Sequence, residues 1–287
     1  MLSDVSVVFF FGGYQTMKIA AIQMVSSAVV AENLATAGQL IDQAASAGAR
    51  LVSLPEYFCQ IGLHETDKYA IAEPLGAGPV QDFLAAKARQ HQIWLAGGSL
   101  PLTTPQPPKV SNTSLLYSPS GEVVARYDKL HLFRYQDGTR SLDESRTMVP
   151  GSALVAAQTD LGRVGLTICY DLRFPELVRA MGPVDLLLVP SAFTETTGRA
   201  HWEVLLRARA IENQCYVLAA AQGGVHTNGR QTHGHSMLVD PWGDVVACLP
   251  SGPGLVMGEM DLERLASVRK AIPTHQHQRL VSALPSS

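Results

Sequence analysis

The sequence predicts an α/β fold in which a single domain contains two β-sheets packed face to face, with helices on the outside of both. Two observations support this prediction. Short apolar runs that are typical of buried strands alternate with helical patterns along most of the chain, and the second half repeats the rhythm of the first. The chain has 287 residues, of which 46% are hydrophobic, so it is long enough for a large buried core. No linker rich in Ser, Gly or charge divides it.

Residues 1–16 precede the first regular pattern. They contain the apolar run 5–11, which lacks the basic residues of a signal peptide and is too short to span a membrane. Met17 then opens a run that is typical of a first strand. We therefore interpret residues 1–16 as an extension or an over-long start assignment, without a targeting role, and residues 17–287 as one domain.

The first half of the chain starts with the strand-like run 18–24, and the following segment has apolar residues at helical spacing. Pro119 and Gly121 mark the turn of a hairpin between two later strands. For this half we predict helices at 32–47 and 79–91 and strands at 18–24, 51–54, 93–99, 114–117 and 122–127.

The second half shows the same alternation, with an apolar run at 185–190 that is typical of a buried strand. Asp240 and Gly243 delimit a turn between two of the last strands. After Pro273 the sequence has no clear pattern, and we expect this tail to contact a neighbouring subunit. The predicted helices are 174–181 and 197–213, and the predicted strands are 164–168, 185–190, 215–220, 236–239, 245–248 and 255–260.

Charge and cysteine usage exclude several classes of protein. The net charge is −3, and there is no basic patch, lysine run or RNA-binding aromatic motif, so we expect no nucleic-acid partner. Four cysteines in a chain of this length do not form a disulfide framework, which indicates a reducing, cytoplasmic location. Three of them, Cys59, Cys215 and Cys248, are expected in or near the core.

Histidines gather in two places without a third metal ligand. Two histidines at i and i+2 can bind zinc, but neither place offers the further His or Cys ligand that a zinc site requires. We therefore expect no metal, and we interpret these side chains as loop, hydrogen-bonding or interface residues: His226, His233 and His235 in one segment, and His275 and His277 in the other.

Cys169 is the most informative single residue. It follows the apolar strand 164–168 and precedes a helix that begins near Phe174 and Pro175. A nucleophile at a strand-to-helix turn projects from the sheet edge, where backbone N–H groups and the helix dipole can stabilise a thiolate and an oxyanion. The alternative is a buried apolar cysteine. The ionisable and phenolic groups that follow Cys169 favour the nucleophile.

Glu56 and Lys129 also follow predicted strands. A carboxylate at the end of the buried strand 51–54 is partly desolvated, which suits a general base, whereas the alternative is a solvated loop glutamate. Lys129 comes just after a hairpin strand, where it can stabilise an oxyanion or be an ordinary surface lysine. Neither residue, taken alone, identifies a catalytic site.

Taken together with Cys169, these residues resemble the three signature segments of the nitrilase superfamily, in the same chain order. The resemblance runs from Lys18 to about Leu280, and the sequence is most similar to that of the Nit branch. The three segments are Leu54-Pro55-Glu56, Tyr127-Asp128-Lys129-Leu130-His131, and Ile168-Cys169-Tyr170-Asp171 followed by Arg173-Phe174-Pro175-Glu176. Residues 201–212 and 234–243 are also similar in sequence to this branch.

The resemblance implies a four-layer αββα sandwich, commonly paired into a homodimer or higher homo-oligomer. It also implies a cysteine-dependent amidase that needs no cofactor. In this interpretation Cys169 is the nucleophile, Glu56 the general base and Lys129 the stabiliser of the oxyanion, with the N–H of Tyr170 as a second donor. Glu144 matches the second glutamate of the family's active site, which helps to position Lys129; without the resemblance it is an exposed loop charge.

The substrate implied by the resemblance is a small amide with a 2-oxo acid head. Nit-branch amidases cleave either the 2-oxo analogue of glutathione or, in the ω-amidase alternative, 2-oxoglutaramate and 2-oxosuccinamate. A noncatalytic scaffold is a further alternative, although all three signature residues are present. Arg173 can hold a carboxylate in a bidentate manner or form an ion pair with Asp171 or Glu176. Phe193 and Thr194 follow a predicted strand, so they either line the pocket or cover the core.

Overall fold

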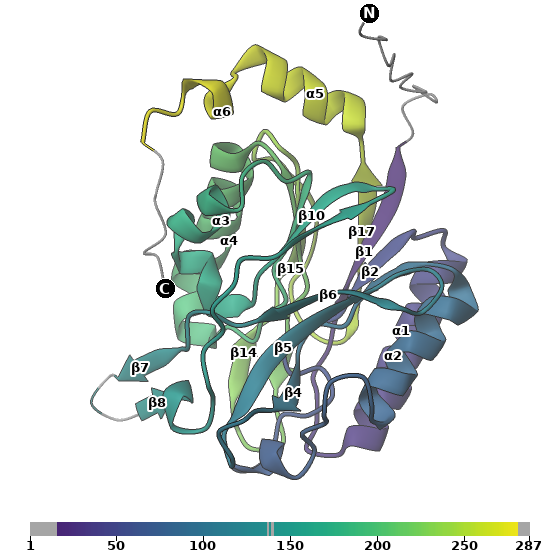
Figure 1. The fold of residues 1–287 in the computed structure, drawn as a ribbon, viewed down its shortest axis with the longest axis vertical. Helices are drawn as coiled ribbons and strands as arrows, with labels where there is room; N and C mark the ends of the chain where they lie inside the picture. The colour runs from purple at the N-terminus through teal and green to yellow at the C-terminus, as the bar shows by residue number, and fades with distance from the viewer. Residues whose placement is uncertain (1–15, 137, 139–140, 281–287) are drawn as a thin grey trace, which may run out of the picture.

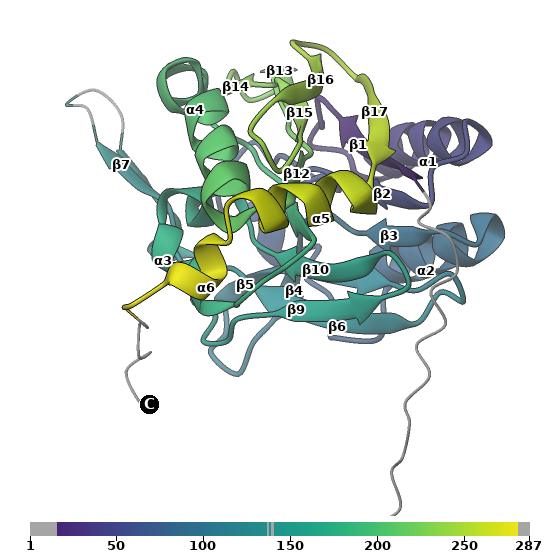
Figure 2. The ribbon, with the colours of Figure 1, turned by 90° about the horizontal axis from the view of Figure 1, so that it is seen from above.

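The computed structural model describes residues 16–136, 138 and 141–280. Two β-sheets lie face to face at its centre, and a pair of helices covers the outer face of each, so the four-layer αββα prediction is confirmed (Figures 1 and 2). The predicted extension falls almost entirely on residues 1–15, which lie outside the described residues.

The first sheet has seven strands, in the order β17-β1-β2-β3-β5-β4, with β6 paired to β5. Its parallel core is β1, β2 and β3, and β17 runs antiparallel beside β1. The strands are β1 (Met17–Gln23), β2 (Leu51–Ser53), β3 (Trp94–Ala96), β4 (Leu100–Thr103), β5 (Val110–Tyr117), β6 (Val123–Asp128) and β17 (Gly254–Met260).

The second sheet has six strands, in the order β16-β15-β12-β11-β10-β9, and its parallel core is β10, β11 and β12. Each half of the chain thus contributes the three parallel strands at the centre of one sheet, which explains the repeated rhythm of the sequence. The strands are β9 (Ala156–Thr159), β10 (Gly162–Leu166), β11 (Leu186–Leu188), β12 (Tyr216–Ala219), β15 (Ser236–Val239) and β16 (Val245–Leu249).

Helices α1 and α2 cover the first sheet, α3 and α4 cover the second, and α5 crosses one end of the sandwich (Figure 2). Helix α2 was predicted with the same bounds, and α1, α3 and α4 with ends that differ by one or two residues, whereas α5 was not predicted. The bounds are α1 (Val30–Ser46), α2 (Pro79–His91), α3 (Pro175–Ala180), α4 (Glu195–Asn213), α5 (Leu262–Ala271) and α6 (Thr274–His277), with 3₁₀ helices η1 (Asp67–Tyr69), η2 (Glu144–Arg146) and η3 (Cys169–Arg173).

The alternation of side chains along β1 explains how the layers are held together. Ile19 and Ala21 belong to the core shared with the second sheet, whereas Ala20 and Ile22 belong to the core under α1 and α2. Successive side chains of a strand point to opposite faces, so a strand between two layers must be apolar on both. This is why the central strands are continuous apolar runs.

The predicted strand 93–99 ends early, at Ala96. Gly98 has a φ of +58°, and a Cβ at this position would lie 2.1 Å from the carbonyl oxygen of Pro55. The chain therefore turns at Gly98, close against the backbone that carries Glu56, and continues as β4. The Ser99 hydroxyl accepts a hydrogen bond from the N–H of Tyr57 at 3.1 Å, which further holds this loop.

Two short hairpins were not predicted from the sequence, and one cysteine was placed wrongly. The hairpins are β7 (Arg134–Gln136) with β8 (Ser141–Asp143), and β13 (Gly223–Val225) with β14 (Gln231–His233). Cys59 and Cys215 are buried as expected, but Cys248 is exposed. Its strand, β16, lies at the edge of the second sheet, where the apolar pattern of the sequence does not imply burial.

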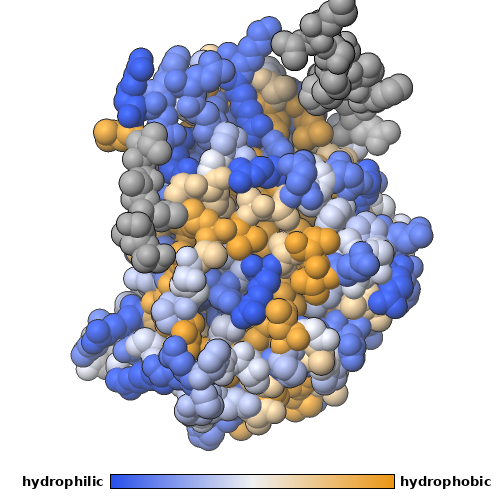
Figure 3. Space-filling model, in the orientation of Figure 1, coloured by the Kyte–Doolittle hydropathy of each residue, from blue (hydrophilic) through white to orange (hydrophobic). Residues whose placement is uncertain are grey.

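Two further features are an apolar area on the surface and the segment after Pro273. Apolar residues gather near the middle of one face, over β6 and β10 (Figure 3), and Val123 and Val124 of β6 are exposed there. Beyond Pro273 the chain forms α6, where the ring of His275 lies 2.9 Å from the carbonyl oxygen of Asn213 within the same chain. A separate finding concerns membranes: among the described residues, no helix is both long and apolar enough to cross one.

Candidate active site

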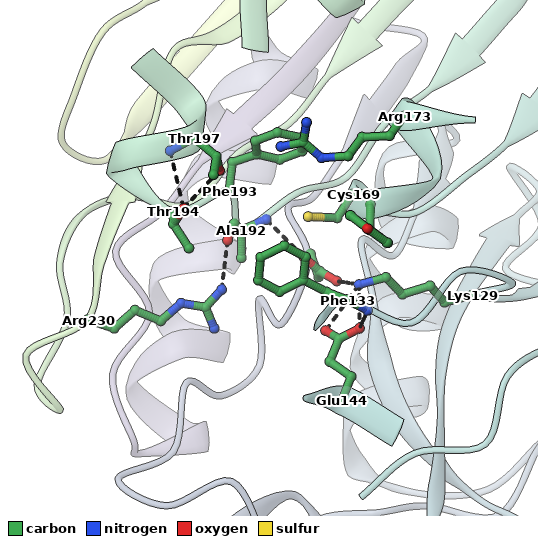
Figure 4. A pocket seen from close by; sticks show the side chains of 12 residues that line it. Lys129, Phe133, Glu144, Cys169, Arg173, Ala192, Phe193, Thr194, Thr197 and Arg230 are labelled. Carbon is green, nitrogen blue, oxygen red and sulfur yellow. Dashed lines mark hydrogen bonds and ion pairs between the residues drawn. The ribbon is translucent and has the colours of Figure 1, made fainter. Parts of the chain in front are cut away.

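The three signature segments meet at the edges of the two sheets. Glu56 follows β2 of the first sheet, Lys129 comes directly after β6, and Cys169 opens η3 after β10 of the second sheet. Their side chains line one small chamber (Figure 4), in which all three are almost completely buried: Glu56 and Lys129 are each 1% exposed and Cys169 is 7% exposed.

Both oxygens of Glu56 are held by hydrogen bonds. Oε1 accepts from Lys129 Nζ at 2.8 Å and from Asn112 Nδ2 at 2.9 Å, while Oε2 accepts from the N–H of Ala192 at 2.9 Å. A buried carboxylate needs such partners because desolvation of its charge is costly. The contacts come from both sheets, so the carboxylate stands at a fixed place beside Cys169.

Lys129 lies between two carboxylates. Its Nζ is 2.8 Å from Glu56 Oε1 and 2.9 Å from Glu144 Oε2. Burial acts to lower the pKa of this lysine, but the adjacent charges of Glu144 and Glu56 outweigh it and raise the pKa above its ordinary value. The ammonium is therefore charged at neutral pH, and it is directed at the space in front of the thiol.

Glu144 is anchored from three sides. Tyr57 Oη donates to its Oε1 at 2.6 Å, the N–H of Phe133 donates to its Oε2 at 2.7 Å, and Lys129 donates to it as well. Burial acts to raise the pKa of Glu144, but the charge of Lys129 and these hydrogen bonds together lower it below its ordinary value. The residue is thus an ionised partner of Lys129 and not the exposed loop charge that its local sequence suggests.

Cys169 has an unusual backbone conformation. Its φ is +50°, in the left-handed region that costs a residue with a side chain about 1 kcal/mol. The hydrogen bond from its N–H to the carbonyl oxygen of Pro190, 2.9 Å long, holds the turn. Such a conformation directs the side chain away from the strand and into the chamber, as at other strand-to-helix nucleophile turns.

The surroundings of Cys169 favour the thiol and not the thiolate that the sequence led us to expect. Burial, followed by the negative charge of Glu56, raises the pKa of the thiol well above its ordinary value, although Lys129 acts to lower it. In addition, the helix after Cys169 is the short 3₁₀ helix η3, and α3 begins only at Pro175. The resting form is therefore the thiol, and a base must take its proton during attack.

Asp171 joins the segment of Cys169 to the segment of Lys129. Its carboxylate, fully buried, accepts hydrogen bonds from Tyr127 Oη at 2.7 Å and from the N–H groups of Ile168 at 2.9 Å and His131 at 3.1 Å. Because Tyr127 and His131 are both two residues from Lys129, they can bind Asp171 while Lys129 reaches the chamber. This contact explains why both segments carry these residues.

The chamber walls contain all the predicted substrate-contacting residues. The space is small, about 20 Å³, which is enough for roughly one water molecule. Tyr170, Arg173, Phe193 and Thr194 all line it, and the buried Phe193 also belongs to the hydrophobic core.

Arg173 does not form an ion pair with Asp171 or Glu176, its neighbours in the sequence. Asp171 is occupied by Tyr127 and His131, and the guanidinium instead lies 5.2 Å from the Phe193 ring centroid. Its Nη1 is 3.2 Å from Nδ1 of His201. No carboxylate of the described chain lies within ion-pair distance of Arg173, so its charge faces the chamber without a counterion.

Several residues of the site were missed by the sequence interpretation. Asn112 had a signal: it lies in the polar stretch Ser111–Ser114 of a strand that is buried throughout, which requires polar partners inside the protein. The others lie in loops or helix ends and had no such signal: Tyr57, Phe133, Thr197 and Arg230.

A second, larger cavity of about 640 Å³ adjoins the chamber. The two share Phe133, Glu144, Thr194 and Arg230 in their walls. The larger one extends between the segment that contains η1, the hairpin β7–β8 and the loop between β13 and β14, and it also contains Lys68. A volume of this size accommodates a small organic molecule.

The histidines serve as hydrogen-bonding residues. The ring of His226 is buried between the carbonyl oxygen of Ser26 and the hydroxyl of Thr232, and its pKa is lowered by burial. His233 stacks on His235 and pairs with Glu195. Within the part of the chain that the structure describes, no group of three His, Cys, Asp or Glu side chains could hold a metal ion.

Comparison with known proteins places this site in a family. The sequence pattern of the carbon–nitrogen hydrolases matches residues 18–270. A protein from Synechocystis sp. (strain PCC 6803 / GT-S) that is named deaminated glutathione amidase is 44% identical over 269 residues, which are 91% of this chain and 98% of the relative.

Solved structures agree with this placement. The crystal structure of the C. elegans NitFhit protein is similar with a TM-score of 0.84 and 41% identity, over 93% of this chain and 66% of that protein. Saccharomyces cerevisiae Nit3, described as a member of branch 10 of the nitrilase superfamily, is similar with a TM-score of 0.81 and 33% identity, over 90% of this chain and 95% of Nit3. The chain therefore belongs to the carbon–nitrogen hydrolase family, in the Nit branch of the nitrilase superfamily.

Proposed function

We propose that the protein is a cysteine-dependent amidase that hydrolyses deaminated glutathione, the 2-oxo analogue of glutathione, to 2-oxoglutarate and cysteinylglycine. The observation that carries this proposal is the chamber in which Cys169, Glu56 and Lys129 meet beside a cavity of about 640 Å³. The name of the Synechocystis relative supports the same substrate.

In the first half of the proposed reaction, Cys169 Sγ attacks the amide carbonyl carbon and a C–S bond forms. The thiol proton passes to Glu56, which is necessary because the raised pKa of Cys169 leaves little thiolate at neutral pH. The tetrahedral oxyanion is held by the Lys129 ammonium and the N–H of Tyr170. Collapse breaks the C–N bond, and the amine leaves with the proton from Glu56.

In the second half, Glu56 removes a proton from water, and the hydroxyl oxygen attacks the thioester carbonyl. The second tetrahedral intermediate uses the same oxyanion donors. Its collapse breaks the C–S bond and releases the acid, and Glu56 returns its proton to the sulfur, which restores the thiol. Glu144 keeps Lys129 charged and in place throughout. Tyr170, Arg173, Phe193 and Thr194 are proposed to surround the acyl group, with Arg173 on its carboxylate.

The larger cavity is the feature that favours deaminated glutathione over an ω-amidase substrate. Both kinds of substrate have a 2-oxo acid head, but ω-amidases release ammonia, which needs no space beyond the thiol. A dipeptide leaving group needs a cavity of several hundred Å³, as found here. The noncatalytic alternative has no supporting observation, since all three signature residues share one chamber.

We propose that this reaction repairs a side product of glutathione metabolism. Transamination of glutathione gives the 2-oxo analogue, and its hydrolysis would return both halves to metabolism as a repair reaction in the cytoplasm. We also propose a homodimer or higher homo-oligomer, because α4 exposes Val204 and Ile211 and the adjacent turn exposes Trp242. Apolar residues gathered on one surface in this way are typical of subunit interfaces.

The test is to supply the purified protein with deaminated glutathione and, separately, with 2-oxoglutaramate, and to measure 2-oxoglutarate. We expect the first substrate to have the higher kcat/KM, and Cys169→Ala to lower it by at least about 10⁴-fold while the protein remains folded. Preference for 2-oxoglutaramate would assign the ω-amidase activity instead. No release from either substrate would contradict the proposed function.

A further inference from the structure

The large cavity contains a lysine without a counterion. Lys68 lies in η1, and its Nζ donates a hydrogen bond of 3.1 Å to the hydroxyl of Thr147. The ammonium also lies 5.9 Å from the centroid of the Tyr57 ring. No carboxylate of the described residues lies within ion-pair distance of it. A half-buried cation in this situation can bind an anion without first breaking an ion pair.

The acidic side chains of the same cavity, by contrast, mostly lie within ion-pair distance of a basic side chain. Glu144 is paired with Lys129 at 2.9 Å, Asp143 lies 3.9 Å from Arg134, and Glu195 is paired with Arg199 at 2.8 Å and with His233. Burial lowers the pKa of Lys68, whereas the charges of Glu144 and Glu65 raise it, both from beyond ion-pair distance. Lys68 therefore presents to the cavity a charge that no carboxylate of the described residues pairs with.

Arg230 adds a second cation at the junction of chamber and cavity, since it lines both. One of its nitrogens, Nη2, donates to the carbonyl oxygen of Ala192 at 2.7 Å, while its Nε is buried without a hydrogen-bond partner. Figure 4 shows Arg230 and Arg173 reaching the chamber from different elements. The positive groups therefore run from Arg173 in the chamber, through Arg230, to Lys68 in the large cavity.

From this arrangement we infer that Lys68 is a specificity-determining residue, which binds a carboxylate on the leaving amine of the substrate. The inference rests on the proposed function and deepens it. Arg173 lines only the chamber and Lys68 lines only the large cavity, so the substrate class that fits is an amide with a carboxylate at each end, one on the acyl part and one on the amine. Deaminated glutathione has this form, with its glycine carboxylate at the amine end.

The experiment compares two substrates that differ only at that end: deaminated glutathione, and the same molecule with a carboxamide in place of the glycine carboxylate. Each is given to the wild type, Lys68→Met and Lys109→Met. Lys109 is the matched control because its Nζ donates to the carbonyl oxygen of Ser145, in the same segment that Lys68 anchors, but it lines neither cavity.

We expect the wild type to prefer the acid over the carboxamide by about tenfold to 100-fold in kcat/KM, the usual effect of one hydrogen bond to a charged group. Lys68→Met should lose this preference by a fall on the acid alone, with less than about twofold change on the carboxamide. Lys68→Arg should restore part of the preference, and Lys109→Met should keep all of it.

Two results would overturn the inference without contradicting the proposed function. One is an equal kcat/KM of the wild type on the acid and the carboxamide, and the other is an equal fall in kcat/KM on both substrates in Lys68→Met. The wild-type comparison needs no variant, so it decides even if Lys68→Met fails to fold. Cleavage of neither substrate by the wild type would instead contradict the proposed function, and this inference with it.

Discussion

The chamber and the adjoining cavity each contain a lysine, and the two lysines differ in their partners. In the chamber, Lys129 is within 2.9 Å of both Glu56 and Glu144, and every oxygen of the two carboxylates has a donor. In the cavity, Lys68 has the hydroxyl of Thr147 and the ring of Tyr57 as partners, and no carboxylate of the described residues lies within ion-pair distance of it. The same residue type is thus fully paired in the chamber and without an ion pair in the adjoining cavity.

The difference indicates two uses of charge. Paired and buried groups keep one geometry because any movement would expose an uncompensated charge, so they stabilise a transition state without reorganising. An unpaired cation has poor solvation and no ion pair to give up, so it gains from the arrival of an anionic ligand. The chamber is therefore suited to chemistry, and the cavity to recognition.

The largest expected effect comes from removing the paired lysine. Lys129→Met should lower kcat by about 10³-fold or more and the free energy of unfolding by about 3–5 kcal/mol, because Glu56 and Glu144 would be left buried without their cation. Lys68→Met should change the free energy of unfolding by about 1 kcal/mol or less, since only one hydrogen bond is lost. Urea unfolding at pH 7 measures both values. Equal destabilisation in the two variants would remove the distinction between the two regions.

An intermediate effect is expected from Asp171, which positions both Lys129 and Cys169 without touching the chamber. Asp171→Asn replaces an acceptor by a donor opposite Tyr127 and His131, so the two catalytic segments should shift apart. We expect kcat to fall by about tenfold to 100-fold with little change in KM.

The matched control for this variant is Asp185→Asn. Asp185 also accepts several hydrogen bonds, from the N–H of Arg163 at 2.7 Å and from Arg269 at 2.8 Å, but it lies away from the site. It should lose stability and keep its kcat. Unchanged kcat in Asp171→Asn would show that the contact between the segments is purely structural.

The smallest effect concerns pH. The pKa of Glu144 is lowered in the folded protein, so its contribution to stability is complete above its unfolded pKa and is lost as the pH falls through its folded pKa. The free energy of unfolding of the wild type should therefore decrease more steeply below about pH 4.5 than that of Glu144→Gln. Urea unfolding at a series of pH values tests this, and parallel curves for the two proteins would contradict it.

Much of the fold could be predicted because it depends on local patterns. The continuous apolar runs of the central strands follow from burial on both faces, and the helix 79–91 was predicted with the same bounds that α2 has. Errors arose where a neighbour decides the outcome. Gly98 ends β3 because the backbone at Pro55 lies against it, and Cys248 is exposed because β16 has no strand beyond it.

The candidate site shows the same division. Glu56, Lys129 and Cys169 could be selected because each follows a strand and each lies in a segment similar to a known family. The role of Arg173 stayed open between a substrate carboxylate and a local ion pair, since the sequence does not show that Tyr127 and His131 occupy Asp171. Lys68 and Arg230 had no signal at all, because they lie outside the apolar strands.

By itself, the sequence determined the central parallel strands of both sheets and the four helices that cover them, the two-sheet architecture and the three segments that end at the sheet edges. The tertiary structure alone decided which charges meet. Asn112 and Ala192 lie 56 and 136 residues from Glu56 along the chain, yet both donate to its carboxylate. Hydrophobic periodicity is a property of neighbouring residues, whereas the pairing of charges depends on distances in space that are set only when the two sheets pack together.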